Sequence, residues 1–404
     1  MNTLDDYLSI VGEETLQSLR EKIERIKDKH IVFINSTYQG GGVAEMLNSL
    51  IPLFNISGLK VGWRIVHGSR DFFTITKKIH NGLQGKEVEL SDYEKRIYYE
   101  TNRRYSLFTH LDHDLVVVHD PQPLAMIKFY EKKQPWIWRM HIDLSNPNRA
   151  IWNYVKEFVT HYDEVVISNK SYSIKDFPKP QRIIYPAIDP LSLKNKELSN
   201  AEVSSILSKY EIRMDKPIIS QVSRFDIWKD PLGVIEVFEE VRKDVDCQLI
   251  LLGSMASDDP EGFKVLEQVE KRASQSKFRE DIHILNVSSD LLVNAVQRGS
   301  TVVIQKSKRE GFGLVISEAL YKRTPVVASN IGGIPLQIKN GYNGFLHDPK
   351  DIQGFAKDLI KIIRDKELRD ELGNNGREFV VKNFLITRLM SDWLDLFHNH
   401  LKNK

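Results

Sequence analysis

Two carboxylates, Glu310 and Glu318, stand eight positions apart around a Gly-Phe-Gly turn. The residues after the turn follow a helical pattern, so we expect Glu310 to precede a helix and Glu318 to lie within it. A carboxylate can accept two neighbouring hydroxyls at once, as the diols of ribose and of hexoses require. Backbone N–H groups at the start of that helix are expected to bind sugar hydroxyls or phosphate oxygens. They belong to Gly311, Phe312, Gly313 and Leu314. The pattern indicates a sugar or nucleotide site, although paired carboxylates also serve glycoside hydrolases.

Two cations, Arg224 and Lys229, lie in the segment VSRFDIWKD, just after a predicted strand. Arginine offers a planar fork of N–H donors, and lysine offers a compact point charge. At the carboxyl end of a strand this combination suits a diphosphate. Taken alone, the segment is better interpreted as a solvated loop.

A glycine-rich loop, GGGVAE at residues 40–45, separates a predicted strand from a predicted helix. Glycines let the backbone approach a ligand closely, and the N-terminus of the following helix offers N–H groups. The loop is not G-x-G-x-x-G, so the sequence gives little support to a dinucleotide site. A tight turn without a ligand is the alternative.

Two further pairs of residues follow predicted strands: His119 with Asp120, and His141 with Asp143. Ligands of parallel sheets bind at the carboxyl ends of the strands, so these residues are candidates for ligand contact. A structural hydrogen-bonding role is the alternative for each histidine. The pairs lack a convincing third ligand, so no tight metal site is predicted.

The elements that must position these residues are short apolar, β-branched runs with helical patterns between most of them. In the first half the runs are 31–34, 61–66, 114–119, 136–141, 164–168 and 182–185; in the second half they are 217–222, 248–253, 281–285, 301–305, 325–329 and 344–347. This alternation predicts an α/β protein with two doubly wound, Rossmann-like halves. We expect a polar linker near 190–200 and a central cleft that the carboxyl ends of both sheets face.

Length and composition narrow the class of protein. With 404 residues, 57 Lys+Arg and 55 Asp+Glu, the chain carries a net charge of +2 and should form two domains. The balanced charge argues against a nucleic-acid binder. No apolar run approaches the roughly 20 residues of a membrane span, and the acidic start does not resemble a secretory signal. We therefore expect a cytoplasmic protein with no membrane partner. Its one cysteine excludes an intramolecular disulfide.

In combination, these motifs resemble the retaining GT-B glycosyltransferases of family 4, over nearly the whole chain. More narrowly, NSTYQGGGVAE (35–45), HDPQPL (119–124) and RMHIDLS (139–145) are similar to the trehalose glycosyltransferring synthases. These synthases join a nucleotide-activated glucose to free glucose. The related trehalose phosphorylases share much of the pattern. One departure is the segment SRFDIWKD, where many relatives have a glycine before the arginine and another after the lysine.

The resemblance implies roles for the candidates in the second half. Arg224 and Lys229 neutralise the donor's diphosphate as it leaves. Glu318 binds the ribose diol of the nucleotide. Glu310 and the backbone amides after it bind hydroxyls of the donor glucose.

The resemblance also implies roles in the first half. His141 lies over the donor sugar near its anomeric centre, and Gly41 and Gly42 approach the phosphates or the acceptor. The candidates for the acceptor glucose are Glu45, Asp120 and Gln122.

The domain boundaries follow from the resemblance as well. The final helix crosses back, so one domain comprises 1–192 plus 386–404 and binds the acceptor, and the other comprises 193–385 and binds the donor. No Asp-x-Asp follows an early strand, so no cofactor is expected to be tightly bound, and magnesium acts only through the nucleotide's phosphates.

The implied reaction makes α,α-trehalose from UDP-glucose or ADP-glucose and glucose, and releases the nucleoside diphosphate. The alternatives are a phosphorylase that uses glucose 1-phosphate, a non-catalytic protein that binds a sugar nucleotide, and a hydrolase. A homodimer is consistent with the sequence.

Overall fold

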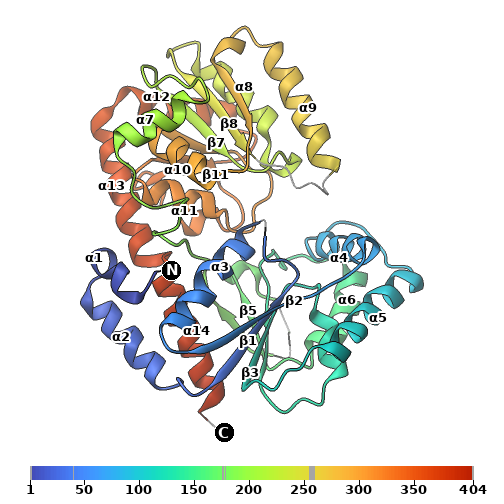
Figure 1. Ribbon diagram of the computed structural model, residues 1–404. Helices are drawn as coiled ribbons and strands as arrows, with labels where there is room; N and C mark the ends of the chain where they lie inside the picture. Colours follow the sequence, from blue (N-terminus) through green and yellow to red (C-terminus); the bar gives the residue numbers. More distant parts are fainter. Residues whose placement is uncertain (1, 40, 175–176, 178, 254–259, 403–404) are drawn as a thin grey trace. The chain divides into compact units, whose positions relative to one another are not determined.

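The structure, a computed structural model, describes residues 2–39, 41–174, 177, 179–253 and 260–402. The chain divides into two compact units (Figure 1): unit 1 is Met1–Pro186 with Ile386–Lys404, and unit 2 is Ala187–Leu385. The first boundary therefore lies between Pro186 and Ala187 instead of after residue 192. The reason is that Ile188 pairs with Leu385 and donates its N–H to Phe384 O at 2.9 Å, so this segment already belongs to unit 2.

Unit 1 contains a parallel sheet with the strand order β2-β1-β3-β4-β5-β6. Its strands are β1 (His30–Asn35), β2 (Lys60–Ile65), β3 (Leu115–His119), β4 (Trp136–Arg139), β5 (Glu164–Ile167) and β6 (Gln181–Ile183). The chain places β2 on one side of β1 and β3 on the other, so the order reverses between β1 and β3. At such a reversal the loops leave on opposite sides of the sheet and open a crevice at its carboxyl edge.

Unit 2 contains a second parallel sheet, with the order β12-β11-β10-β7-β8-β9. Its strands are β7 (Ile218–Val222), β8 (Gln248–Gly253), β9 (Ile282–Asn286), β10 (Val302–Gln305), β11 (Val326–Ser329) and β12 (Gly344–His347). Here the order reverses between β7 and β10. Each predicted run forms a strand in the expected place, and the predicted α/β class is confirmed.

Helices connect the strands of each unit. Unit 1 contains α1 (Leu8–Val11), α2 (Glu13–Glu24), α3 (Gly41–Ile56), α4 (Arg70–Leu83), α5 (Asp92–Phe108), α6 (Arg149–Val159) and α14 (Ile386–Leu401), with the 3-10 turns η1 (Leu4–Tyr7), η2 (Leu124–Phe129) and η3 (Lys170–Tyr172). Unit 2 contains α7 (Asn200–Ser208), α8 (Pro231–Val241), α9 (Pro260–Ser274), α10 (Asp290–Gly299), α11 (Leu314–Tyr321), α12 (Ile352–Arg364) and α13 (Lys366–Asn383), with η4 (Ile227–Lys229), η5 (Arg279–Asp281) and η6 (Ile334–Leu336).

The three- and four-residue spacing of apolar residues over 4–29 predicts one helix, but the structure divides this segment into η1, α1 and α2. Gly12, at the junction of α1 and α2, has a φ of 79°. This left-handed backbone suits glycine and ends the first helix before the second begins.

Alternate residues of the unit 2 strands pack into different cores, which is the physical basis of the doubly wound fold. In β8, Leu249 and Leu251 belong to a cluster with residues of α8, α9 and α12. Ile250 and Leu252, between them, belong to a cluster with residues of α7 and α10. Both faces of the sheet are therefore covered.

The last helix, α14, packs on unit 1, where Figure 1 shows it beside α2 and α3. Its Trp393 ring lies 5.4 Å from the Phe33 ring of β1. Lys22 of α2 pairs with Asp395 at 2.6 Å, and His400 lies 2.6 Å from Glu164 of β5. Apolar periodicity alone does not tell which half the helix covers.

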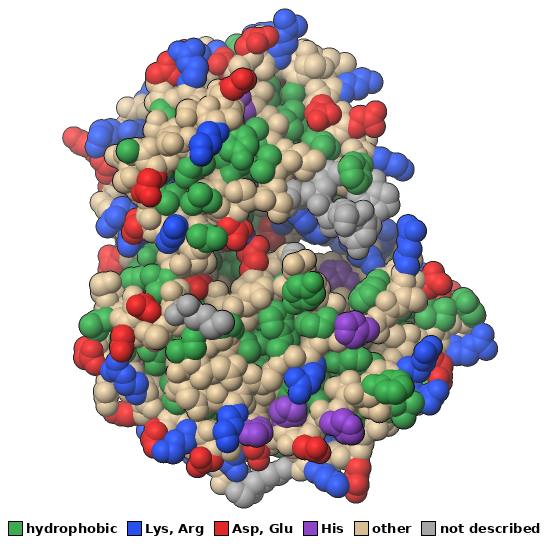
Figure 2. Space-filling view, in the orientation of Figure 1, with side chains coloured by type: hydrophobic (Ala, Val, Ile, Leu, Met, Phe, Trp, Pro, Cys, Tyr) green, Lys and Arg blue, Asp and Glu red, His purple; other side chains and the backbone are tan. Residues whose placement is uncertain are grey.

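The surface carries both signs of charge. Figure 2 shows Lys and Arg side chains interspersed with Asp and Glu, in keeping with the net charge of +2. Across the described ranges, no helix is both long enough and apolar enough to span a bilayer.

Candidate functional site

The loops after β7 and β10 meet at the switch point of the unit 2 sheet. Lys229 ends the short η4 turn after β7, and Glu310 follows β10. Their side chains form an ion pair with Nζ and Oε2 2.5 Å apart, largely shielded from solvent. The same Glu310 oxygen lies 3.4 Å from Gln305 Nε2 and from Ser307 Oγ. The structure thus brings together Lys229 and Glu310, as the order of the strands favours.

Arg224 is held differently from Lys229. Its side chain is 54% exposed and forms a loose ion pair with Asp226, at 3.6 Å. A guanidinium that is so exposed and so loosely held can turn toward a ligand at little cost. Lys229 would first have to leave Glu310.

Asp230, next to Lys229, fastens the two loops to each other. Its backbone is left-handed, with a φ of 48°, and its carboxylate is buried. It forms an ion pair with the buried Lys306 and another, of 2.7 Å, with Lys308. Lys308 N also donates to Trp228 O at 2.7 Å. These bonds fix the η4 turn against the segment that leads to Glu310.

The Gly-Phe-Gly turn is a rigid start to α11. Gly313 has a φ of 80°, which favours glycine. A Cβ at Gly333 would lie 2.5 Å from Gly311 O, so that position also requires glycine. Gln337 donates to Phe312 O at 2.5 Å and accepts from Ser317 N and Oγ at 3.1 and 2.6 Å. Leu314 is the first residue of α11, so its N–H lies at the helix N-terminus.

Glu318 lies on the second turn of α11 and is only 5% exposed. Gln297 Nε2 donates to Glu318 Oε2 at 3.2 Å. The buried Lys322 donates to Gln297 Oε1 and to Asn195 Oδ1, both at 2.7 Å. Burial lowers the pKa of Lys322 to about 7. Glu318 and Glu310 are therefore held by different partners.

In unit 1, His119, Asp120 and His141 meet at the carboxyl ends of β3 and β4, beside the switch point. His119 Nδ1 lies 2.9 Å from His141 Nε2. Asp120 has a left-handed φ of 59° and accepts His141 N on Oδ1 at 3.1 Å. Its O accepts Trp138 Nε1 at 3.0 Å. Burial raises the pKa of Asp120 to about 7, so near neutral pH this carboxyl is partly protonated.

Buried charge surrounds the two histidines. Arg139 is 1% exposed, and its Nη2 donates to Ser168 Oγ at 3.1 Å. Burial lowers its pKa to about 9. Burial, with the Arg139 cation acting in the same direction, lowers the pKa of His119 to about 3 and that of His141 well below its usual value. Both imidazoles are neutral at physiological pH.

The remaining unit 1 candidates lie on loops and at a helix start. Gln122 is half-buried, and its backbone O accepts Asn102 Nδ2 at 3.1 Å. Gly41 begins α3 with a φ of 80°, and a Cβ there would meet no described atom within 4 Å. Gly42 and Glu45 are exposed on the first turns of α3. Gly40, the first residue of the glycine-rich loop, lies outside the described residues.

Four residues that contact or lie near the candidate residues of the two units are not predicted by the sequence: Asp230, Lys306, Lys322 and Arg139. Only Asp230 has a signal in the sequence, because the family resemblance implies a glycine at this place, and glycine is typical of a left-handed backbone. The other three depend on side-chain packing. Among the described residues, no group of three or more His, Cys, Asp or Glu side chains is arranged to bind a metal ion.

Comparison with known proteins agrees with this arrangement of motifs. Residues 33–174 match the family described as "Trehalose synthase, N-terminal domain", and residues 203–379 match "Glycosyl transferases group 1". The trehalose synthase of Rubrobacter xylanophilus is 44% identical over 98% of this chain and 96% of its own. The trehalose synthase of Thermococcus litoralis is 41% identical over 98% of this chain and 97% of its own.

The chain belongs to the trehalose synthase family of glycosyltransferases. The resemblance drawn from the motifs is thereby confirmed. Trehalose synthases share their pattern with a second group: the trehalose phosphorylase of Grifola frondosa is 28% identical over 94% of this chain and 58% of its own.

Solved structures show that this member of the trehalose synthase family has the GT-B fold. The α,α-trehalose-phosphate synthase of Burkholderia xenovorans matches with a TM-score of 0.74 at 13% identity, over 92% of this chain and 100% of its own. The sucrose-phosphate synthase of Thermosynechococcus elongatus matches with a TM-score of 0.72 at 16% identity, over 93% and 100%.

Proposed function

We propose that the protein makes α,α-trehalose from a nucleoside-diphosphate glucose and free glucose, with retention at the anomeric carbon and release of the nucleoside diphosphate. The observation that carries the proposal is the cluster of side chains at the switch point of the unit 2 sheet. There a cation, Lys229, and a carboxylate, Glu310, lie beside the N-terminus of α11, whose buried Glu318 is one turn further on. This set of groups suits the diphosphate and the hydroxyls of a sugar nucleotide.

The donor would replace the contacts that the free protein makes with itself. A sugar hydroxyl would donate to Glu310 in place of Lys229, which would then turn to the diphosphate together with Arg224. The loss of the 2.5 Å ion pair costs little here, since each partner finds a new one. As the C1–O bond breaks, negative charge grows on the diphosphate, and two nearby cations stabilise it.

The acceptor glucose would bind to unit 1. Asp120, with its pKa raised to about 7 by burial, can donate or accept a hydrogen bond with a sugar hydroxyl. Gln122 and Glu45 would supply further contacts, and His141 would contact the donor sugar. The proposal requires that the donor and the acceptor be bound at the same time.

Retention is proposed to follow from attack on the face from which the diphosphate leaves. The acceptor hydroxyl attacks C1, the C1–O bond to the diphosphate breaks, and a leaving phosphate oxygen takes the hydroxyl proton. The step needs no carboxylate nucleophile. Any stimulation by magnesium would come through the nucleotide's own phosphates.

A phosphorylase that uses glucose 1-phosphate is the second candidate, favoured by the likeness to the Grifola frondosa protein. Glu318 distinguishes the two only weakly, since a carboxylate that binds a ribose diol is useful mainly when a nucleotide is present. We expect UDP or ADP to raise the melting temperature much more than inorganic phosphate does. Glu318→Gln should lose most of the nucleotide shift, while Glu267→Gln, at an exposed position of α9, should keep it.

The proposal is tested by a panel of donors, each with free glucose: UDP-glucose, ADP-glucose and glucose 1-phosphate. Disaccharide formation from a nucleotide sugar, with nucleoside diphosphate in equal amount, is the expected result. Product from glucose 1-phosphate alone would establish the phosphorylase instead. Nucleotide binding with no product from any donor would indicate a non-catalytic protein.

A further inference from the structure

The two imidazoles at the carboxyl edge of unit 1 form one hydrogen-bonded unit. His119 Nδ1 and His141 Nε2 are 2.9 Å apart. The ring planes differ by 19°, and the ring centroids are 5.2 Å apart. Nearly coplanar rings whose nitrogens meet at this distance lie edge to edge, so the lone pair of one nitrogen points along the N–H of the other. His119 is 1% exposed, whereas His141 is partly exposed to solvent.

A hydrogen bond between two neutral imidazoles contains one proton. The ring that donates this proton determines the tautomer of both rings. If His119 donates from Nδ1, then His141 accepts on Nε2 and has its own proton on Nδ1. If His141 donates from Nε2, then its Nδ1 is a bare lone pair and His119 has its proton on Nε2. The two arrangements present opposite groups at Nδ1 of His141.

The surroundings of His119 Nε2 decide between the arrangements. This atom is buried and has no hydrogen bond with any residue that the structure describes. Arg139 is the register partner of His119 across β3 and β4, and its Nε and Nη1 are likewise buried without a partner among the described residues. An N–H at Nε2 would add an unsatisfied donor beside a cation, which is costly. A lone pair there is complementary to the guanidinium.

We propose that His119 is a positioning residue that fixes His141 as the Nδ1–H tautomer, so that His141 presents a hydrogen-bond donor to the substrate. The ring of His119 is itself fixed, since it packs against Phe33 at 5.5 Å and Trp393 at 6.4 Å between ring centroids. Asp120 fixes the backbone of His141 through its N–H at 3.1 Å. The orientation and the tautomer of His141 thus have separate causes.

The consequence for catalysis rests on the proposed function, in which His141 contacts the donor sugar. A neutral Nδ1–H can donate to a sugar hydroxyl oxygen or to the ring oxygen, whereas the other tautomer can only accept there. Because both rings stay neutral at physiological pH, His141 acts as a fixed donor and does not release a proton in the reaction.

The test uses two substitutions of similar size at one buried position. In His119→Asn, the nearby Arg139 cation attracts the amide oxygen, so the amide N–H₂ faces His141 and replaces the original donor. In His119→Leu, no donor remains. The tautomer of His141 is read from its ring ¹⁵N chemical shifts in the ligand-free protein, with His141→Gln to assign the signals. The kcat and KM for trehalose formation are measured alongside the melting temperature.

We expect the Nδ1–H tautomer in the wild type and in His119→Asn, and a mixture of tautomers in His119→Leu. The kcat should fall about tenfold in His119→Leu, the size of a lost hydrogen bond, and recover in His119→Asn. An Nε2–H tautomer in the wild type, or an unchanged tautomer in His119→Leu, would overturn the assignment. If no variant makes trehalose, the proposed function fails, and the nitrogen shifts still decide the tautomer.

Discussion

Lys229 and Arg224 belong to one loop, but their side chains differ in how closely they are ion-paired and in how far they are exposed. Lys229 is paired with Glu310 at 2.5 Å, and Arg224 is mostly exposed and 3.6 Å from Asp226. If both stabilise a leaving diphosphate, replacing either by alanine should lower kcat about 10²-fold or more, as the loss of comparable charge-stabilising donors does. Steady-state kinetics of Arg224→Ala and Lys229→Ala measure this.

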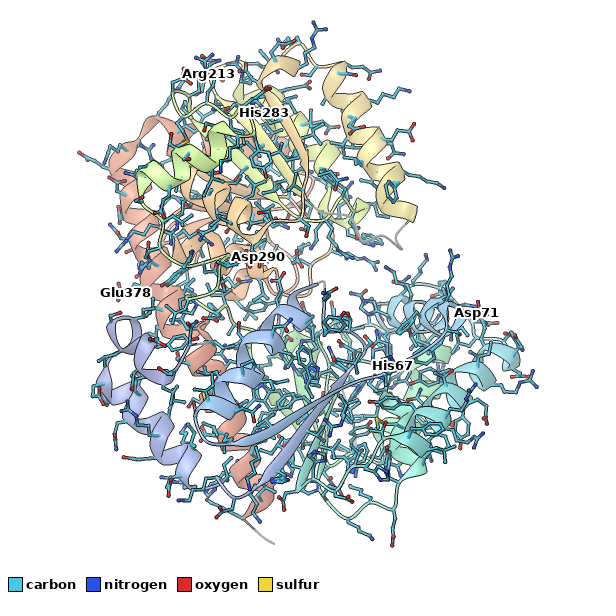
Figure 3. All side chains as sticks on the ribbon, in the orientation of Figure 1. His67, Asp71, Arg213, His283, Asp290 and Glu378 are labelled. Atoms are coloured by element: carbon cyan, nitrogen blue, oxygen red, sulfur yellow. The ribbon has the colours of Figure 1, made fainter. Side chains whose placement is uncertain are left out.

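The matched control for these variants is Arg213→Ala. Arg213, labelled in Figure 3, is an exposed cation of the same unit, ion-paired with its neighbour Asp215. Its replacement should leave kcat unchanged. Normal turnover in a folded Arg224→Ala protein would contradict the role assigned to this residue.

For single residues, the sequence predicts which side chains lie near one another. It predicts less well which hydrogen bonds and ion pairs they form. Lys229 and Glu310 follow strands of one sheet, so their approach could be expected. The bond between His119 and His141, and the burial of Arg139 beside them, depend on side-chain directions that no spacing in the chain encodes.

Among the elements, the η4 turn depends on Asp230 for its attachment to the segment after β10. Removing one charge from a buried ion pair leaves the other uncompensated. Asp230→Asn would leave Lys306 in that state, since the two side chains are 7% and 4% exposed. We expect the free energy of unfolding to fall by about 3 kcal/mol or more. Urea unfolding of the two proteins measures the difference.

The variant Asp230→Gly separates the effect of the lost carboxylate charge from the effect of the left-handed backbone. Glycine tolerates the left-handed φ of 48° but leaves Lys306 unpaired. It should therefore be destabilised like Asp230→Asn. Stability equal to the wild type in Asp230→Gly would show that the ion pair does not hold the turn. Asp215→Asn, which breaks an exposed pair, should change stability little.

The sequence predicts the strands well because most are short apolar runs, and inner strands such as β3, β8 and β10 are buried along their whole length. It predicts boundaries less well, since these depend on single contacts. The run at 4–29 contains Gly12, whose left-handed backbone divides one expected helix in two. The polar segment near 190–200 resembles a linker, yet Asn195 within it binds the buried Lys322 at 2.7 Å.

For the molecule as a whole, Lys322 should impose a pH dependence on stability. Burial lowers its pKa to about 7 from the ordinary lysine value of 10.5. Between these values the unfolded chain binds more protons than the folded protein, so stability should rise with pH, by at most about 1.4 kcal/mol per pH unit. Lys322→Met should lack this component of the rise.

Urea unfolding between about pH 7 and about pH 9 tests the prediction as the difference between wild type and Lys322→Met. Lys209→Met, at an exposed lysine of the same unit, should behave like the wild type. A difference that does not change with pH would mean that Lys322 stays charged in the folded protein.

In the proposed reaction, two bound sugars are joined head to head through their anomeric carbons. The most direct test is the NMR spectrum of the product formed from UDP-glucose labelled with ¹³C at C1 and unlabelled glucose. We predict a non-reducing disaccharide in which the labelled carbon and its partner both have the small H1–H2 coupling of an α-anomer, with UDP in equal amount. A reducing disaccharide, a β-configured labelled carbon, or labelled free glucose as the only product would contradict the proposed reaction.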